Sequence, residues 1–448
     1  MPVQVHNYYD ANDNVTSTTS AQGLQSKRVL DERDMVYQSV AGANSDSAGT
    51  FTSNYDANGN VSTSVDARGY STSYTYDGFD RTMRVDDPAG HYRTTTYDAN
   101  SNALYSRAYS SAGVLLAESL RSYDEIDRAY QTAVTAKDHE GNNIGDGLAT
   151  STVLFDKNSR VTSSTDDNGV TFYRFYDAAS RVSSTRDAVG NETSNVYNSD
   201  GAVTKTNFYE INGLTNTLEK SHVEYDLDKM NRKIAFRDQR YASGTFDTQI
   251  DYAYDSASQL VTLTDAAGTE TSYTYDLLGR ALQTTRKPTA TAATWIVTLN
   301  TWDKDSRLTK QQISKNPDTN TSWQTTEYMY DERSRRITTR RADGDVWTYK
   351  YDENGNMKEW LDPLGTRVTH VYDSRNLLTT RNIARASGIK GATYEVYAYD
   401  GLGRPTSCSN YDGSSQISAT SCDYDTLSLK ERCTLTVTNS VLVRARTG

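Results

Sequence analysis

Larger side chains alternate with small polar ones in short runs along this chain. In "YSTSYTY" at 70–76, Tyr74 and Tyr76 share one parity and Thr75 stands between them. The same Tyr-x-Tyr step recurs at 252–254, 273–275, 328–330, 349–351 and 397–399. A period of two over about six residues rich in Tyr, Thr and Val is typical of a β-strand. No stretch keeps a helical period, so the pattern predicts an all-β protein with almost no helix.

A short motif closes each of these runs. It consists of an aromatic residue, Asp, two variable residues, a small or polar residue, and then Arg or Asn, as in "YDGFDR" at 76–81. Counting degenerate copies headed by Leu30 and Tyr424, the chain carries 18 copies. The other aromatic positions are Tyr9, Tyr55, Tyr76, Tyr97, Tyr123, Phe155, Tyr176, Tyr197, Tyr225, Tyr254, Tyr275, Trp302, Tyr330, Tyr351, Tyr372 and Tyr399.

The spacing of the copies is regular, which indicates a repeat architecture. Of the 17 spacings between consecutive copies, eight are 21 residues and the other nine range from 25 to 32 residues. In all eight 21-residue units a Gly stands seven places before the aromatic: Gly23, Gly69, Gly90, Gly169, Gly190, Gly268, Gly344 and Gly365. In six of them an Asp stands ten places before it: Asp66, Asp87, Asp166, Asp187, Asp265 and Asp362. We therefore expect one repeat array over residues 1–448, with atypical terminal repeats at 405–448.

Each unit contains two turn signals. The first is Asp-x-x-Gly, as in "DPAG" at 87–90, where Asp bonds nearby backbone N–H groups and Gly accepts a positive φ. The second follows the Tyr-Asp pair, as in "ANGN" at 57–60, and Asn-Gly between alternating runs is a strong hairpin signal. The two signals together predict an array of antiparallel β-hairpins.

The motif residues have separate expected tasks. The Tyr closes a strand and stacks on its counterparts in neighbouring units, a contact worth roughly 0.2–1 kcal/mol per pair. The Asp begins the turn, and the Arg or Asn begins the return strand. Ion pairs within or between units are expected for Asp77 with Arg81, Asp177 with Arg181, Asp276 with Arg280, and Asp400 with Arg404.

These motifs resemble the YD repeats of the rearrangement-hotspot (RHS) family. The resemblance rests on "YDANGN", "YDGFDR", "YDAASR", "YDLLGR" and "YDGLGR", each in a 21-residue frame or a longer variant, and spans essentially the whole chain. Relatives include bacterial polymorphic toxins, B and C components of insecticidal toxin complexes, wall-associated proteins and teneurins. The resemblance implies a β-ribbon that spirals into a hollow shell, which in toxin members encloses a C-terminal toxic domain.

The chain departs from the toxin-bearing members at their self-cleaving core segment. That segment carries a DPxGL-like motif, whereas "DPLG" at 362–365 is followed by Thr366 and keeps the ordinary repeat register. The end, "TLTVTNSVLVRARTG", is expected to be one more strand pair. We therefore predict a chain that is not an enzyme, with no catalytic, cofactor or metal site.

Composition and charge narrow the range of partners. Only 35% of the 448 residues are hydrophobic and the mean hydropathy is −0.75, which suits a ribbon without a thick apolar core. The net charge of −11 argues against nucleic acid or an anionic membrane as the main partner. No apolar run reaches the roughly 18 residues of a membrane helix, and "MPVQVHNYYD" has no secretory signal. Because the repeat begins at Tyr9, we expect a piece of a longer protein.

The three cysteines, Cys408, Cys422 and Cys433, favour free thiols in or beside strands. One disulfide stays open, and spacing does not assign its pairing. The absence of CxxC argues against a zinc site.

Other candidate sites are weak. The five histidines, His6, His91, His139, His222 and His370, show no metal-ligand or triad spacing, and the Asp-x-x-Gly turns lack the dense carboxylates of a calcium loop. The basic run at 333–341 suits a solvated sheet edge. The five tryptophans favour strand packing, with a sugar-stacking surface as the alternative; they are Trp295, Trp302, Trp323, Trp347 and Trp360.

The sequence thus predicts a non-enzymatic shell or scaffold segment of a secreted or surface-delivered RHS-type protein. Its expected partners are an enclosed toxin domain or the remaining repeats of a longer protein. The alternative is a glycan-binding or adhesion module. Because an open array exposes its edges, we also expect residues 1–448 alone to associate or to fold poorly.

Overall fold

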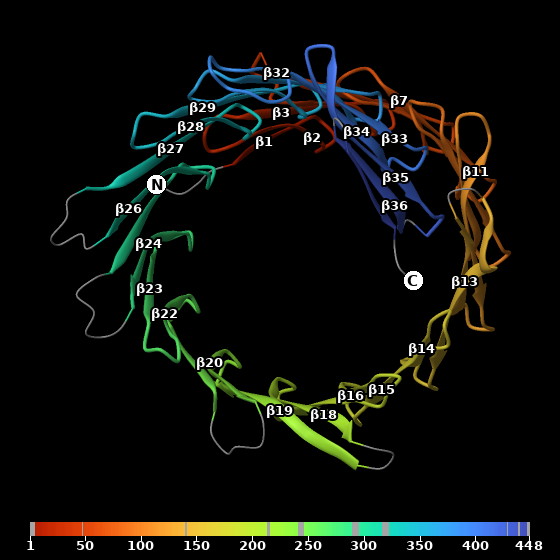
Figure 1. Cartoon of the computed structure of the whole chain (residues 1–448), viewed down its shortest axis with the longest axis vertical. Coiled ribbons are helices and arrows are strands. Elements are labelled where there is room, and N and C mark those ends of the chain that lie inside the picture. Colours follow the sequence, from red (N-terminus) through yellow and green to blue (C-terminus); the bar gives the residue numbers. More distant parts are fainter. Residues whose placement is uncertain are drawn as a thin grey trace. The chain divides into compact units, whose positions relative to one another are not determined.

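The computed structural model describes residues 5–46, 48–138, 141–212, 216–240, 246–288, 295–315, 322–427, 429–437 and 440–445. Among these residues there is no helix, and the strands form a single antiparallel sheet in which strands pair with their sequence neighbours (Figure 1). The predicted all-β hairpin array is therefore confirmed. The expected terminal strand pair is present as well, although residues 438–439 and 446–448 lie outside the described part.

The strands fall into three ladders, named by their order in the chain. The N-terminal ladder consists of β1 (His6–Tyr9), β2 (Val15–Thr19), β3 (Gln25–Leu30), β4 (Val36–Ala41), β5 (Gly49–Tyr55), β6 (Val61–Val65), β7 (Ser71–Tyr76), β8 (Thr82–Asp86), β9 (Tyr92–Tyr97), β10 (Ala103–Tyr109), β11 (Leu115–Tyr123) and β12 (Ala129–Lys137). The middle ladder consists of β13 (Asn143–Phe155), β14 (Val161–Thr165), β15 (Thr171–Tyr176), β16 (Val182–Arg186), β17 (Glu192–Tyr197), β18 (Val203–Asn212), β19 (Asn216–Leu227), β20 (Lys233–Arg240), β21 (Thr248–Tyr254), β22 (Leu260–Thr264), β23 (Glu270–Tyr275), β24 (Ala281–Lys287), β25 (Ile296–Trp302) and β26 (Leu308–Lys315). The C-terminal ladder consists of β27 (Gln324–Tyr330), β28 (Arg336–Arg340), β29 (Val346–Tyr351), β30 (Met357–Leu361), β31 (Arg367–Tyr372), β32 (Leu378–Ala384), β33 (Tyr394–Tyr399), β34 (Pro405–Asp412), β35 (Ser415–Tyr424), β36 (Lys430–Val437) and β37 (Ser440–Ala445).

Two kinds of hairpin alternate along each ladder, as the two turn signals predict. The motif hairpin of β7 and β8 pairs Tyr76 with Thr82, and its register shifts by one residue next to Tyr76. The Asp-x-x-Gly hairpin of β6 and β7 pairs Thr63 with Ser73 and keeps its register. We call the two connections the YD turn and the DxxG turn. Because consecutive turns lie at opposite ends of the strands, each ladder has a YD edge and a DxxG edge.

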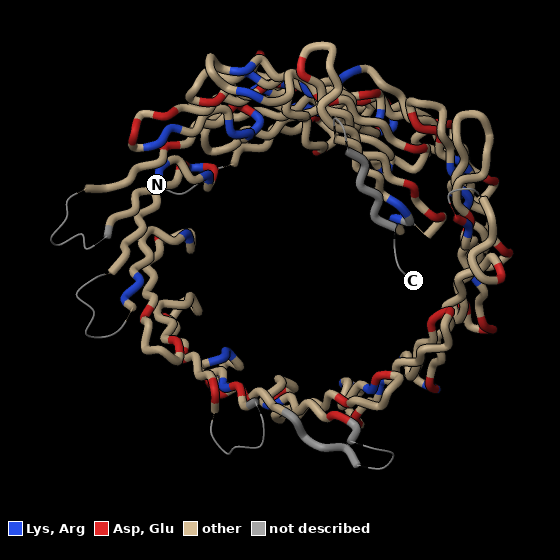
Figure 2. Tube along the Cα trace, in the orientation of Figure 1, with Lys and Arg blue, Asp and Glu red and all other residues tan. Residues whose placement is uncertain are grey.

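The sheet has little apolar core. Among the described residues, the buried apolar side chains are Ala136, Ala235, Val297 and Val368. Most strand residues are half-buried, and acidic and basic residues are interspersed along the trace (Figure 2). Stability must therefore come mainly from the repeated ladder hydrogen bonds and turns, as in other repeat proteins.

The chain divides into two compact units. The first contains Met1–Thr150, Asp303–Arg307 and Glu327–Gly448, so it joins the N-terminal and C-terminal ladders. The second contains Ser151–Trp302 and Leu308–Thr326, which make up most of the middle ladder. The functional arrangement described below lies within the first unit.

Candidate functional site: the YD turns and the seam between two ladders

The Asp of each motif closes its turn with its own backbone and side chain. In the turn Asp77–Arg81, the Asp77 N–H donates to the Arg81 carbonyl at 3.0 Å, and the Asp80 N–H donates to the Asp77 carbonyl at 3.1 Å. The Asp77 Oδ1 atom accepts the N–H groups of Phe79 at 2.9 Å and Arg81 at 3.1 Å. The carboxylate thus satisfies donors that the tight turn leaves free, which explains why Asp follows the aromatic residue.

The fourth residue of each YD turn adopts a left-handed conformation wherever the structure describes it. It is glycine in some copies, with φ of 92° at Gly59 and 97° at Gly355. In others it is a small polar residue, as at Asp80 (φ 59°) and Ser180 (φ 64°). A single left-handed residue after a type I-like turn matches the bulged hairpin, and the small or polar position of the motif reflects this requirement.

The Arg that ends the motif reaches back to its Asp and forward to the next copy. In the C-terminal ladder, Arg335 donates Nε to Asp331 Oδ2 at 2.7 Å and a terminal nitrogen to the Asp352 carbonyl at 3.0 Å. All four ion pairs predicted from the sequence form, and each lies within its own turn: Asp77–Arg81, Asp177–Arg181, Asp276–Arg280 and Asp400–Arg404. The forward bond to the next turn links successive repeats along the YD edge.

The arginines that end several copies lie against the aromatic of the next copy, so in these copies the predicted stacking of tyrosine on tyrosine is wrong. The Arg335 guanidinium lies 4.8 Å from the ring centroid of Tyr351, the aromatic of the next copy. The same relation joins Arg81 to Tyr97 at 4.6 Å and Arg160 to Tyr176 at 4.5 Å. Successive motif aromatics lie two strands apart, roughly 10 Å, so rings do not meet and the planar cation fills the gap.

In many copies the tyrosine hydroxyl anchors its unit to the preceding one. Tyr76 donates to the Val61 carbonyl at 2.9 Å, and Tyr372 donates to the Met357 carbonyl at 2.9 Å. Trp302, which replaces Tyr in one copy, donates its indole N–H to the Ala281 carbonyl at 2.9 Å. In this copy the indole N–H of Trp therefore replaces the hydrogen bond that the tyrosine hydroxyl makes elsewhere.

The turn carboxylates are stabilised in their charged form. Backbone hydrogen bonding from Asn60 lowers the pKa of Asp56, and hydrogen bonding from the Arg81 side chain lowers the pKa of Asp77. Hydrogen bonds within the turn likewise lower the pKa of Asp10, Asp31, Asp98, Asp124, Asp156 and Asp177. These groups stay ionised at neutral pH, so they serve as turn acceptors and ion-pair partners.

A seam joins the DxxG edge of the N-terminal ladder to the YD edge of the C-terminal ladder. At its centre Arg68, in a DxxG turn, donates to the carbonyls of Tyr372 and Asp373, both at 3.0 Å. Its Nε lies 3.8 Å from Asp352 Oδ2. Asn354 donates back across the seam to Asp66 at 2.5 Å. The separations of the bonded pairs range from 283 to 308 residues, so the two edges run alongside each other in steady register.

The two ends of the seam are also bonded. Ser20 donates its hydroxyl to Asp305 at 2.7 Å, and the Gln22 N–H donates to the same carboxylate at 3.1 Å. Asp305 lies in the YD turn between β25 and β26, which belongs to the first unit and extends the YD edge of the C-terminal ladder. At the other end the Thr426 N–H donates to the Lys137 carbonyl at 2.9 Å, and the Lys137 N–H donates to Thr426 Oγ1 at 2.8 Å. Ser20 stands where six of the eight 21-residue units have Asp, and an Asp there would face the Asp305 carboxylate.

The seam also brings aromatic and apolar groups of the two ladders together. A pocket of about 300 Å³ lies between the ladders, lined on one side by His91, Tyr92 and Tyr109 and on the other by Gly401 and Leu402. Tyr92 and Tyr109 stack with centroids 4.7 Å apart. A Cβ on Gly401 would lie 2.4 Å from Leu116 Cδ1 and 2.9 Å from His91 Cδ2. The seam therefore needs glycine at position 401 for close approach.

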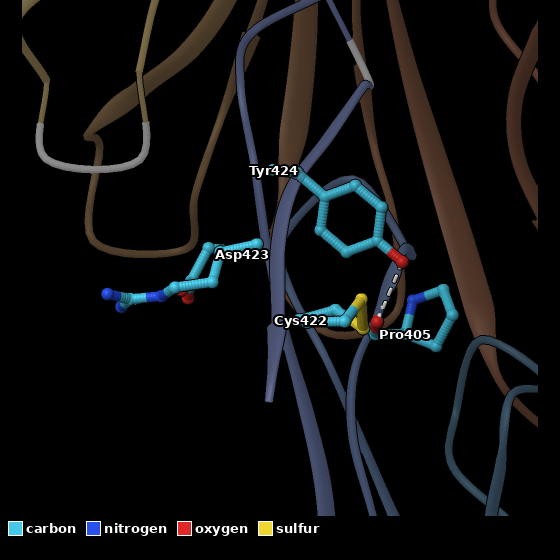
Figure 3. Close-up of a disulfide and its surroundings, with 6 residues drawn as sticks. Pro405, Cys422, Asp423 and Tyr424 are labelled. Atoms are coloured by element: carbon cyan, nitrogen blue, oxygen red, sulfur yellow. Dashed lines mark hydrogen bonds and ion pairs between the residues drawn. A yellow bond between two sulfur atoms is a disulfide. The ribbon is translucent and has the colours of Figure 1, made fainter. Parts of the chain in front are cut away.

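Cys422 and Cys433 form a disulfide, with Cα atoms 4.2 Å apart (Figure 3). Cys408 is a free, half-buried thiol. The expectation of three free thiols is thus wrong for two of them. The two residues lie directly opposite each other on β35 and β36, which spacing alone does not reveal. Beside them the Tyr424 hydroxyl donates to the Pro405 carbonyl at 2.9 Å, so the last motif copy keeps its aromatic anchor.

A polar cluster surrounds the free thiol on the face of β32 to β34. Arg381 pairs with Glu395 at 2.9 Å, and the Tyr397 hydroxyl donates to the same carboxylate at 2.5 Å. Burial, with the Glu395 contact, raises the pKa of Tyr397 to about 12. Burial also raises the pKa of Cys408, with the Glu395 charge as the next cause. Both groups are therefore protonated at neutral pH, which suits structure rather than nucleophilic chemistry.

The tryptophans and the DPLG segment have structural roles, in strand packing and in a turn. The five tryptophans are all half-buried, so no exposed indole surface supports the sugar-binding alternative. "DPLG" forms an ordinary DxxG turn, with the Gly365 N–H on the Asp362 carbonyl at 3.1 Å. His139 lies outside the described residues. Within the described part of the chain, no group of His, Cys, Asp and Glu is arranged to hold a metal ion, and no helix is long and apolar enough to cross a membrane.

The repeated YD and DxxG hairpins define an antiparallel β-hairpin repeat protein. The RHS Repeat family model matches residues 55–92, 254–292 and 351–388, each of which contains motif copies found above. The predicted resemblance is confirmed: the chain carries RHS repeats. No curated protein matches the chain significantly by sequence.

The chain is also similar to several solved structures. One is the crystal structure of TcdB2-TccC3-Cdc42, with 14% identity and a TM-score of 0.48. Another is TcdB2-TccC3 without its hypervariable C-terminal region, with 15% identity and a TM-score of 0.47. A third is the Tc holotoxin pore of Photorhabdus luminescens, with 15% identity and a TM-score of 0.34. Each match covers all of this chain and 28% of the other, so the chain spans less than a third of their length.

Proposed function

We propose that this chain is a structural, non-enzymatic wall segment of an RHS-type shell. The observation that carries the proposal is the seam, because its bonded pairs keep separations of 283 to 308 residues along its whole length. A ribbon that meets itself in steady register extends a wall with every added repeat, instead of thickening a core. The scarcity of buried apolar side chains supports the same reading.

The wall has a face that suits a non-native polypeptide as cargo. The residues just before several motif aromatics are large, apolar and exposed; they are Leu154, Phe175, Val196, Met329 and Val371. Strand alternation puts them on the face opposite the motif tyrosines. Exposed apolar side chains of this kind contact unfolded chains without specific recognition. We therefore propose an enclosed toxin domain, or further repeats of a longer, secreted or surface-delivered protein, as the partner.

Small-angle X-ray scattering of the purified chain tests the wall. A compact globule of this length has a radius of gyration of about 22 Å, whereas an unfolded chain reaches about 78 Å. A curved wall predicts a value clearly above the first and well below the second, with strand-type circular dichroism. A radius near that of the compact globule would contradict the proposal.

Enclosure is tested by protection of a cargo. An unstructured reporter peptide fused after Gly448 should be cut by trypsin more slowly than the same peptide fused to an unrelated folded protein. Equal cleavage rates would contradict enclosure of a cargo but would not contradict the proposal that the chain is a wall segment. We do not carry the glycan-binding alternative further, because the half-buried tryptophans give it no surface.

A further inference from the structure

The first unit has two outer edges that repeat the chemistry of the seam. The seam uses the DxxG edge of the N-terminal ladder and the YD edge of the C-terminal ladder. The opposite ends of the same strands therefore form an outer YD edge on the N-terminal ladder and an outer DxxG edge on the C-terminal ladder. The outer YD edge comprises the turns at 10–14, 31–35, 56–60, 77–81, 98–102 and 124–128, and the outer DxxG edge includes those at 341–345 and 362–366.

The third residue of a YD turn recurs among the seam contacts, although Gly401 and Thr426 make theirs from the second position. Asp305 bonds Ser20, Asn354 bonds Asp66, and Leu402 lines the pocket beside His91. In each YD turn along the seam, the third residue is half-buried. These residues are Asp305, Arg333, Asn354, Arg375, Leu402 and Leu427. In each YD turn of the outer edge, the third residue is exposed. These residues are Asn12, Arg33, Asn58, Phe79, Asn100 and Ile126. The third turn residue is thus covered by the other ladder on the seam edge and exposed to solvent on the outer edge.

Large apolar side chains stand at these free positions. Phe79 is 79% exposed and Ile126 is 63% exposed, and both correspond to Leu402, which is half-buried in the seam pocket. The outer DxxG edge carries Leu364 at 71% exposure. Isolated exposed apolar residues are common, but here they recur at the position that the seam uses for contact.

We propose that the outer YD edge docks on the outer DxxG edge of a second copy of this chain, repeating the seam between molecules. The two edges differ, so the contact is heterologous and leaves one free edge of each kind on every assembly, which permits growth by further copies.

Charge favours this pairing over one between two like edges. Each of the six turns of the outer YD edge carries a net negative charge, so two such edges would repel each other. The outer DxxG edge mixes both signs: Arg340, Arg341, Arg385 and Lys390 stand among Asp343, Asp345, Asp362 and Asp412, and Arg385 pairs with Asp412 at 2.9 Å. The acidic outer YD edge is therefore repelled less by the outer DxxG edge of a second copy than by another outer YD edge, and it finds several basic groups there.

Sedimentation or light scattering of the full chain over a range of concentrations tests the proposal. The wild-type chain should associate progressively as concentration rises. Phe79→Asn with Ile126→Asn should weaken association about tenfold or more with unchanged circular dichroism, because Asn58 and Asn100 show that the turn accepts Asn at this position. Leu154→Asn is the matched control, since Leu154 is 65% exposed but lies on β13 rather than at a turn.

Mixing separates a heterologous contact from any other. Leu364→Asn blocks the other edge, and Asn168 shows that a DxxG turn accepts Asn there. At a concentration at which the wild-type chain associates, each blocked variant alone should be mostly monomeric, and an equal mixture should form dimers that grow no further. A monomeric wild-type chain at all concentrations would overturn the proposal. So would association that Leu154→Asn reduces as much as the edge variants do, or blocked variants that fail to complement.

Discussion

Asn354 donates a hydrogen bond of 2.5 Å to the carboxylate of Asp66, which precedes it by 288 residues. Asn354 is the third residue of a YD turn, and Asp66 opens a DxxG turn. The same carboxylate holds its own turn, since Oδ1 accepts the N–H groups of Arg68 and Tyr70. One side chain therefore closes a local turn and bonds a distant repeat, which couples local folding to the seam.

Replacing this amide by a carboxylate should open the seam. In Asn354→Asp the donor is lost and a second negative charge faces Asp66, so we expect a loss of about 1–2 kcal/mol in the stability of the first unit. The urea midpoint measured by circular dichroism should fall. The matched control is Asn158→Asp, at the same position of a YD turn in the middle ladder, which should change the midpoint little.

A charge swap makes the same test specific. Asp66→Asn combined with Asn354→Asp restores one donor and one acceptor across the seam, and an Asn at position 66 still accepts the turn N–H groups. The double variant should recover most of the lost stability. A double variant as unstable as the sum of the two single changes would argue against a direct bond.

Glycine 401 offers a steric test of the seam. An added methyl group at Gly401 would meet Leu116 and His91, whereas the same addition at Gly78 meets nothing within 4 Å. Both glycines follow the Asp of a YD turn, and neither has a positive φ. We expect Gly401→Ala to cost about 1–3 kcal/mol and Gly78→Ala to be neutral or slightly stabilising, measured by urea unfolding. Equal effects would show that the turn, not the seam, dictates position 401.

The repeat made the local structure predictable from sequence, because strand, turn and motif spacing are all short-range. The Asp77–Arg81 pair lies within one turn, and the motif itself reveals it. The seam was not predictable, because its contacts use the third turn residue, which varies among Asp305, Asn354 and Leu402 and has no period. One signal was present: Ser20 interrupts the Asp series, and its partner is an aspartate.

Two other expectations failed for reasons of register and distance. The tyrosines do not stack because two strand spacings separate them, and Arg fills the space. The Cys422–Cys433 pairing depends on which residues of β35 and β36 face each other, and the register shift next to Tyr424 moves that match by one residue. Neither the distance nor the shift can be read from composition.

The forward-reaching arginine gives a prediction on the link between repeats. Arg335 bonds Asp331, bonds the Asp352 carbonyl and covers Tyr351, and its side chain is 14% exposed. Lysine keeps the charge but cannot make these planar contacts together. Arg335→Lys should therefore cost about 1–2 kcal/mol in urea unfolding. Arg28→Lys, at an exposed strand position, is the control and should cost almost nothing. Similar losses of stability in both variants would show that any Arg-to-Lys change destabilises the chain, and would contradict a specific role of Arg335.

The turn carboxylates predict loss of stability in acid. Their pKa values lie below the ordinary 3.8 in the folded chain, since hydrogen bonds favour the charged form. Their contribution is therefore fully present above about pH 4 and is lost as pH falls through the lower, folded values. The melting temperature should be flat from about pH 7 to about pH 5 and drop steeply below about pH 4. A drop centred near pH ~6 would point to histidine instead.

The cysteines allow a chemical check on the last repeats. Without reductant, thiol titration of the unfolded chain should find one reactive thiol, Cys408, because Cys422 and Cys433 are bonded. In the folded chain, burial and the Glu395 charge raise the pKa of that thiol, so less thiolate forms at about pH 8 and alkylation should be several-fold slower than in urea. Glu395→Gln removes the nearby charge and should speed alkylation of the folded chain. Three reactive thiols without reductant would contradict the disulfide, and equal rates in folded and unfolded chains would contradict the burial of Cys408.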